Sequence, residues 1–240
     1  MTIGPAVFIC TIIKNFIITK SHRSIFCNIV CKVLISINHL VQKDLAPLNI
    51  NPNGNQSNLI NPKDNDHILL LYEDDACRDN SVITYINEGL RKGQLCFYCT
   101  VKLEPETAER LRSDIIDYDH NVSNGNFRVM DFEPFYLSAL KRDLAPFEKL
   151  KTDIMAAVKE RKDSHVRLVG DAVTYLFRYM HFKEFEMLEK WWQNKPFKGS
   201  YLCPFSKSLI ERLPHAAHEY ALKHILHDVI VECPKIQRAP

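Results

Sequence analysis

The chain has 240 residues, of which 46% are hydrophobic and 25% are charged, a composition ordinary for a globular protein of one or two domains. Its formal net charge of +2 comes without basic clusters, so we expect no direct binding of DNA or RNA. Eight cysteines at irregular spacing, with no recognisable signal peptide, are typical of reduced thiols and not of a disulfide framework. These features together predict a cytoplasmic protein.

The composition changes sharply near residue 66. Residues 1–66 hold no Glu, Tyr or Trp, but twelve Ile and ten Asn. We interpret residues 1–50 as an apolar, acid-poor extension with poor order, and residues 51–66, rich in Asn and Pro, as a linker. The folded domain is expected over residues 67–234.

Two apolar runs, residues 6–19 and 25–37, lie inside this extension. A lysine interrupts each of them, and each is shorter than the roughly 20 apolar residues that a bilayer-spanning helix needs. Membrane association through residues 6–37 is therefore an alternative that we do not favour.

From His67 onward, strand-like and helix-like segments alternate. The expected strands are residues 67–72, 95–101, 126–131, 165–170, 200–205 and 228–232. The expected helices are residues 76–92, a helix from Pro105 that carries Leu111, a short piece over 137–144, a longer helix from Pro146, one continuous helix over 173–192, and a helix around 216–226. Such alternation predicts a mostly parallel, three-layer α/β/α sheet.

The buried strand over residues 165–170 ends in Gly170 and is followed at once by Asp171. In open α/β sheets, ligands bind beyond the carboxyl ends of the strands, so Asp171 is our first candidate site residue. Asp171 also stands directly before a helix, where it could cap free backbone N–H groups. The two roles are compatible, and both remain open.

The loop after the first strand excludes the commonest phosphate site. A phosphate-binding loop would place Gly-x-x-x-x-Gly-Lys there. The chain instead has the acidic sequence Glu73-Asp-Asp-Ala-Cys-Arg-Asp79, which would repel a triphosphate. No Gly-x-Gly-x-x-Gly fingerprint occurs either, so neither ATP hydrolysis nor a dinucleotide site of that type is expected.

The sequence gives no metal or cofactor signature by spacing. Cys96 and Cys99 are three apart in a strand and must point to opposite faces. The pairs His215/His218 and His224/His227 fall on opposite sides of a helix, which excludes a four-histidine site. We therefore predict no metal and no cofactor, and His227 is more often a hydrogen-bonded core residue than a ligand.

Several short motifs occur in the order found in one known family. They are His67 before an apolar run to Tyr72, Gly89-Leu-x-x-Gly93, Arg167-x-x-Gly170 with an acid after it, Phe185-Glu186, Cys203-Pro-Phe205, and His227 before the last strand. Over residues 67–232 the chain resembles the MEDS family, the methanogen/methylotroph sensory domain. The resemblance implies a RecA-like fold without Walker A. It also implies a non-catalytic sensor of small ligands such as hydrocarbon derivatives, found alone or joined to signalling modules.

The resemblance also implies a set of ligand-binding residues at the strand-end crevice. They are His67, Tyr72, Asp171, Glu186, Cys203 and His227. The family usually has Glu where Asp171 stands and Tyr where Phe205 stands, and the second change removes a hydroxyl from the presumed pocket. The expected partners are a small-molecule ligand and a signalling protein.

The RecA-like resemblance further implies that the first and fourth strands are neighbours, which would bring Tyr72 next to Asp171. Arg167 lies four residues before Asp171, and we expect it to form an ion pair with a helix carboxylate. The competing hypothesis is a degenerate nucleotide-binding or weak metal-dependent hydrolytic domain that uses Asp171 and Glu186 as its carboxylates.

Overall fold

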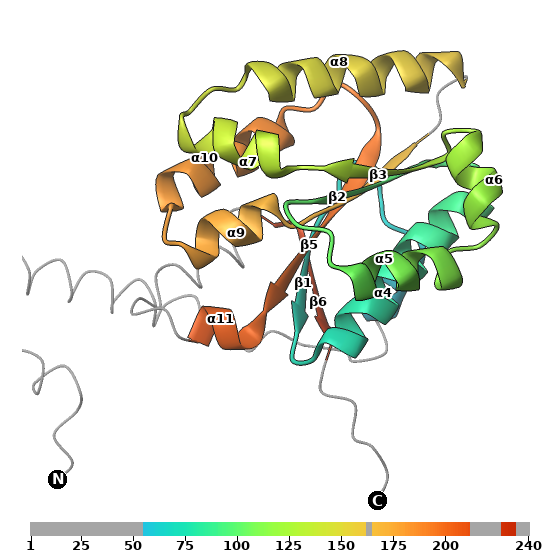
Figure 1. Ribbon diagram of the computed structural model, residues 1–240, viewed down its shortest axis with the longest axis horizontal. Helices are drawn as coiled ribbons and strands as arrows, with labels where there is room; N and C mark the ends of the chain where they lie inside the picture. The colour runs from blue at the N-terminus through green and yellow to red at the C-terminus, as the bar shows by residue number, and fades with distance from the viewer. Residues whose placement is uncertain (1–54, 162–164, 212–226, 234–240) are drawn as a thin grey trace, which may run out of the picture. The chain divides into compact units, whose positions relative to one another are not determined.

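The computed structural model describes residues 55–161, 165–211 and 227–233 (Figure 1). The expectations for residues 1–50, and for the helix around 216–226, lie outside the described residues. Within the described ranges, no helix combines the length and the apolar character of a membrane span.

Six parallel strands form one sheet in the order β3-β2-β4-β5-β1-β6 (Figure 1). Their bounds are β1 His67–Tyr72, β2 Leu95–Thr100, β3 Phe127–Asp131, β4 Val166–Gly170, β5 Gly199–Ser206 and β6 Val229–Cys233. Strand β1 pairs on both sides, so that Ile68 lies opposite Leu202 of β5 and Val229 of β6. The predicted parallel α/β sheet is confirmed. The expectation that the first and fourth strands are neighbours is wrong, because β5 lies between them.

Helices cover both faces of this sheet (Figure 1). One layer holds α3 Asn55–Ile60, α4 Asp75–Arg91, α5 Pro105–Asp114 and α6 Tyr118–Ser123. The other layer holds α7 Glu133–Leu140, α8 Ala145–Glu160, α9 Ala172–Arg178, α10 Phe182–Gln193 and α11 Lys207–Glu211. The three-layer α/β/α architecture is thus confirmed.

Successive side chains of each strand point to opposite faces of the sheet, and this alternation produces two separate hydrophobic cores. In β1, Ile68 and Leu70 face the layer of α4, whereas Leu69 and Leu71 face the layer of α10, and all four are buried. A strand buried on both faces needs this continuous apolar run. The two cysteines of β2 also separate as predicted, because Cys96 and Cys99 belong to different cores.

The single helix predicted over residues 173–192 is in fact two helices. Met180 adopts a left-handed φ of 60°, and His181 N–H donates to the Leu176 carbonyl at 2.8 Å, as in a helix-ending Schellman turn. No Gly or Pro marks the break, so the sequence pattern did not reveal it. The break lets Phe177 of α9 pack against Phe185 of α10, with ring centroids 5.2 Å apart.

Buried Arg167 ties the segment expected to be a linker to the sheet. Its guanidinium donates to the carbonyls of Leu59 and Tyr85 at 2.8 Å and of Ile60 at 2.9 Å, and Nε donates to Gln94 at 2.7 Å. The expected ion pair with a helix carboxylate is therefore wrong. The acceptors are backbone carbonyls, two of them at the end of α3.

Helix α4 leaves space for this arginine at Gly89. A Cβ atom at Gly89 would lie 2.6 Å from Arg167 Cδ, closer than side chains approach one another. The glycine is thus needed for close packing, and its backbone remains helical.

Candidate functional site

A cleft of about 280 Å³ lies beyond the carboxyl ends of the central strands. Tyr72 ends β1, Thr100 ends β2, Asp171 follows β4, and Pro204 lies in β5; all four line the cleft. Side chains of α4, α5 and α9 form its walls. Tyr72 and Asp171 thus share one cleft as expected, although their strands are not neighbours.

Several charged side chains of the cleft neutralise one another. Asp79 accepts from Arg78 Nε at 2.7 Å and from Arg110 Nη1 at 2.6 Å. Arg78 also donates to Asp75 at 2.9 Å and lies over the ring of Tyr72 at 5.5 Å. A ligand with several negative charges would therefore have to displace these ion pairs.

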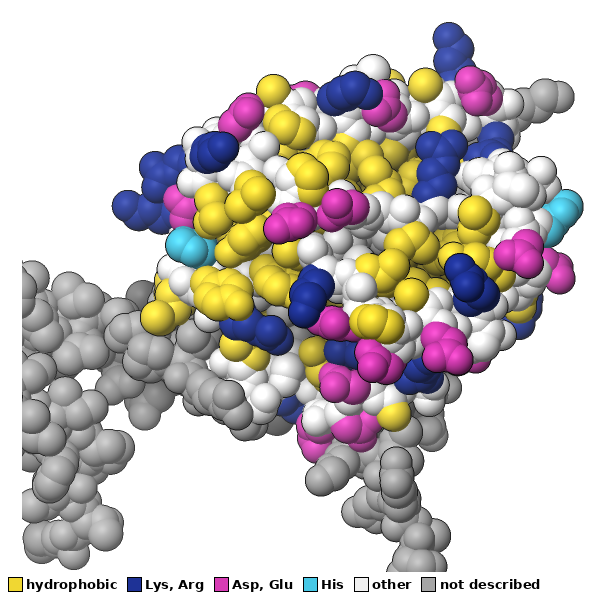
Figure 2. Space-filling view, in the orientation of Figure 1, with side chains coloured by type: hydrophobic (Ala, Val, Ile, Leu, Met, Phe, Trp, Pro, Cys, Tyr) yellow, Lys and Arg dark blue, Asp and Glu magenta, His cyan; other side chains and the backbone are white. Residues whose placement is uncertain are grey.

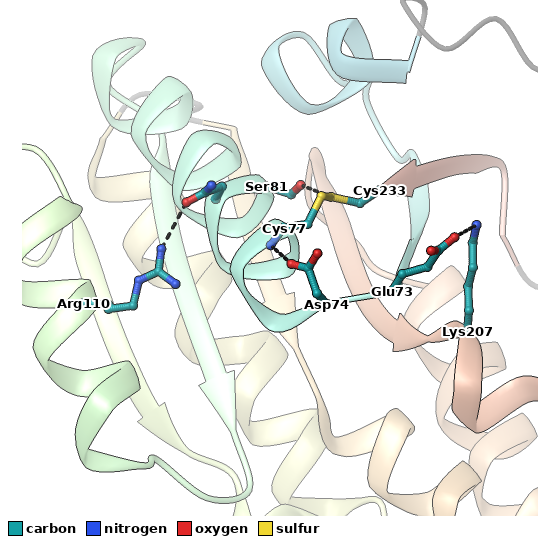
Figure 3. The surroundings of a disulfide bond; sticks show 8 residues. Glu73, Asp74, Cys77, Ser81, Arg110, Lys207 and Cys233 are labelled. Atoms are coloured by element: carbon teal, nitrogen blue, oxygen red, sulfur yellow. Dashed lines mark hydrogen bonds and ion pairs between the residues drawn. A yellow bond between two sulfur atoms is a disulfide. The ribbon is translucent and has the colours of Figure 1, made fainter. Parts of the chain in front are cut away.

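A carboxylate of the chain itself, Asp74, caps the N-terminus of α4. Asp74 accepts from Cys77 N–H at 2.7 Å and so caps the helix, as Figure 3 shows. In a phosphate-binding loop, the corresponding backbone N–H groups would face a phosphate. The acidic loop that excluded a phosphate site by charge thus also fills that position with a carboxylate.

Part of the cleft wall is aromatic and aliphatic. Tyr98 and Tyr175 line it together with Val82 and Leu111. Burial raises the pKa of both tyrosine hydroxyls, so they remain protonated and can donate or accept hydrogen bonds at neutral pH. The cleft therefore offers an apolar wall with a few hydroxyl groups.

Asp171 is held by β2 and does not cap α9 with its side chain. Its carboxylate accepts from the Thr100 hydroxyl at 2.6 Å and from Val101 N–H at 2.8 Å. No side-chain cap hydrogen bond forms to α9, so the capping role is wrong. Burial raises the pKa of Asp171 to about 6, against the opposing effect of these two hydrogen bonds.

This raised pKa gives a stability signature. The pKa of Asp171 is higher in the folded chain than in the unfolded chain. Its contribution to the free energy of unfolding is therefore complete below about pH 4 and is lost as the pH rises through about 6. Between about pH 4.5 and 7.5, the loss should amount to about 2 kcal/mol. We expect Asp171→Asn to remove this loss, since an amide can keep the bond from Val101.

Urea unfolding of wild type and Asp171→Asn at about pH 4.5 and 7.5 measures this loss of stability. The contributions of other titrating groups cancel when the two proteins are compared. The same pH dependence in both proteins would contradict a buried Asp171 carboxyl with a raised pKa.

Three other predicted site residues come together in a second, buried location. His67 Nε2 lies 3.2 Å from Cys203 Sγ and 3.1 Å from Glu189 Oε2. The rings of His67 and His227 have centroids 4.3 Å apart. We name these four residues, His67, Glu189, Cys203 and His227, the buried cluster. The cluster is separate from the side chains that line the strand-end cleft.

Sequence reasoning missed Glu189, although a signal was present. The buried face of α10 reads Phe185, Leu188, Glu189 and Trp192, which is helical spacing with one acid among apolar residues. Glu189 is fully buried, and burial raises the pKa of its carboxyl well above the usual value. An acid on an apolar stripe was the feature to notice.

Glu186 does not join either site. It is an exposed residue of α10 whose carboxylate accepts from Lys190 at 2.6 Å, and both residues border a shallow surface hollow beside α8. Glu186 does not line the strand-end cleft with Asp171. The two carboxylates of the hydrolytic hypothesis are therefore not brought together.

A disulfide contradicts the expectation that the thiols are reduced. Cys77 in the first turn of α4 is bonded to Cys233 at the end of β6, with Cα atoms 6.0 Å apart (Figure 3). Next to it, Lys207 donates to Glu73 at 3.0 Å. The three free cysteines among the described residues, Cys96, Cys99 and Cys203, are all buried.

The fold and the cleft define a class of protein: a parallel α/β domain with a strand-end cleft and no phosphate-binding loop. The model of one family, MEDS (MEthanogen/methylotroph, DcmR Sensory domain), matches residues 66–220, which is more than half of the chain. The chain belongs to the MEDS family, and the resemblance stated from its motifs is confirmed. Membership indicates a sensory role. No curated protein sequence matches the chain.

Proposed function

We propose that this domain is a non-catalytic sensor that binds one small, weakly polar ligand in the strand-end cleft. The observation that carries the proposal is the cleft itself, in which Arg78 and Arg110 are paired with Asp79, and tyrosine and aliphatic side chains remain to contact a ligand. A volume of about 280 Å³ is at the small end of ligand pockets, which suits a small hydrocarbon derivative.

The cleft also suggests how binding could be transmitted. Its walls come from both helix layers, because Arg110 and Leu111 belong to α5 whereas Thr174 and Tyr175 belong to α9. A ligand that touches both helices would favour one spacing between them over another, which is the differential binding that a sensor needs. A signalling protein would read the resulting change.

The nucleotide-binding alternative has less support. Asp74 occupies the end of α4, Arg78 and Arg110 are paired with acids, and Glu186 lies outside the cleft. On the face shown in Figure 2, basic and acidic side chains of the described residues are interspersed, which also suits a partner other than nucleic acid.

A cytoplasmic location is part of the proposal, and the Cys77–Cys233 bond is its sharpest test, because cytosolic disulfides are rare. Free thiols can be alkylated at the moment of cell lysis. If Cys77 and Cys233 are bonded in the cell, they will not be alkylated.

Thermal unfolding with a panel of alcohols, haloalkanes and small aromatics, and with magnesium ATP, tests the proposed ligand class. We expect at least one small organic compound to raise the melting temperature of the full chain, and magnesium ATP to leave it unchanged. For that compound, Tyr175→Ala should weaken binding about tenfold, the equivalent of about 1.4 kcal/mol.

Tyr179→Ala is the matched control, because Tyr179 lies one turn further along, is exposed, and does not line the cleft. Stabilisation by magnesium ATP alone, or equal weakening by the two variants, would refute the proposed site.

A further inference from the structure

We propose that the buried cluster is a binding site for one divalent transition metal of the zinc class. His67, Glu189, Cys203 and His227 each offer one donor atom, and these atoms all lie within 4.8 Å of one another. The site is separate from the strand-end cleft and does not depend on the function proposed for it.

Four distant segments of the chain supply the donors. His67 begins β1, Cys203 lies in the middle of β5, and His227 lies two residues before the first residue of β6. Glu189 reaches them from the buried face of α10. His67 and Cys203 both project toward α10, because they alternate with residues that face the other layer. The convergence therefore follows from strand order and pleat.

The spacing fits a tetrahedral metal centre. With metal–nitrogen and metal–oxygen bonds of about 2.0 Å and a metal–sulfur bond of about 2.3 Å, ligand atoms lie about 3.3–3.6 Å apart. His67 Nε2 is 3.1 Å from Glu189 Oε2 and 3.2 Å from Cys203 Sγ, and Cys203 Sγ is 4.0 Å from Glu189 Oε1. All four donor atoms lie within 4.8 Å of one another, so shifts of up to about 1 Å would place them around one ion.

The charges of the donors fit a divalent ion. One thiolate and one carboxylate carry two negative charges, and two histidines are neutral, so the loaded centre has no net charge. Burying a neutral centre avoids the large cost of an isolated buried charge. On binding, the Cys203 thiol and the Glu189 carboxyl release to solvent the protons that they carry in the metal-free cluster.

The donor types select the metal. Two nitrogens, one sulfur and one oxygen suit Zn²⁺ and its spectroscopic substitute Co²⁺, whereas Mg²⁺ and Ca²⁺ prefer oxygen alone. All four residues are buried, and the ring of Tyr201 lies 5.1 Å from that of His67. Four protein ligands without an open position are typical of a structural site, which would fasten α10 and the start of β6 to the sheet.

Metal-free full chain, prepared with a chelator and without thiol reductant, is titrated with Zn²⁺ and then with Co²⁺. We expect a higher melting temperature with Zn²⁺, and with Co²⁺ the intense visible bands of a tetrahedral ion together with a thiolate charge-transfer band. Cys203→Ser should remove the charge-transfer band and one equivalent of metal, and should weaken binding at least about 100-fold.

Cys99→Ser is the matched control, because Cys99 is also a buried free thiol in the same core but lies outside the cluster. It should keep the band and the stoichiometry. Other cysteines are common to both variants and cancel in the comparison. Metal binding that is the same in Cys203→Ser and Cys99→Ser, or no binding at all, would overturn the proposal in favour of a hydrogen-bonded core network.

X-ray absorption of the zinc-loaded wild type gives a test that does not depend on the folding of a variant. One sulfur with three nitrogen or oxygen neighbours is expected, and a shell without sulfur would overturn the site.

Discussion

Arg167→Ala is expected to lower the free energy of unfolding by about 3–5 kcal/mol, the largest effect of any single substitution that we propose. The change removes every donor that the guanidinium offers to the carbonyls of Leu59, Ile60 and Tyr85. It also leaves a cavity beside Gly89, where Arg167 now packs. Urea unfolding monitored by tryptophan fluorescence gives the free energy.

Two controls accompany this prediction. Arg112→Ala removes an exposed arginine from α5 and should change stability by less than about 0.5 kcal/mol. A chain that lacks residues 1–62, and with them α3, should lose more stability than a chain that lacks residues 1–50. If both truncated chains are equally stable, α3 does not hold Arg167 in place.

The second large effect concerns the bond between Cys77 and Cys233. The two residues are 156 positions apart, so their cross-link closes a long loop in the unfolded chain. Loop-closure entropy predicts that reduction lowers the free energy of unfolding by about 2–4 kcal/mol. The measurement is urea unfolding with and without dithiothreitol.

Cys77→Ser with Cys233→Ser should reproduce the reduced protein, and dithiothreitol should then have no further effect. A reductant effect that persists in the double variant would assign the loss to other cysteines.

The four central strands were predictable from the sequence because they are buried on both faces. Ile68 to Leu71 is a continuous apolar run, and only a central parallel strand needs one. The order of the strands was not predictable in this way. The sequence of β1 contains no signal that β5 and β6 flank it. Analogy with RecA-like folds incorrectly predicted that the first and fourth strands are neighbours.

The candidate site was predictable in part, for a related reason. Tyr72 and Asp171 reach one cleft because the ends of parallel strands meet at one edge of a sheet. The partners of Arg167 are backbone carbonyls, which have no signature in the sequence. The left-handed turn at Met180 likewise arises without a glycine, so tertiary packing decides it.

The position of β1 has a consequence for how the chain folds during synthesis. Both neighbours of β1 in the sheet come late, since His67 pairs with Tyr201 and Ile68 pairs with Val229. At roughly 5–20 residues per second, the ribosome needs about 7–27 s after Tyr72 to deliver the end of β5. Throughout that interval β1, which is buried along its whole length in the folded domain, has neither of its neighbours in the sheet. Nascent chains of this protein should therefore depend on chaperones that shield extended apolar segments.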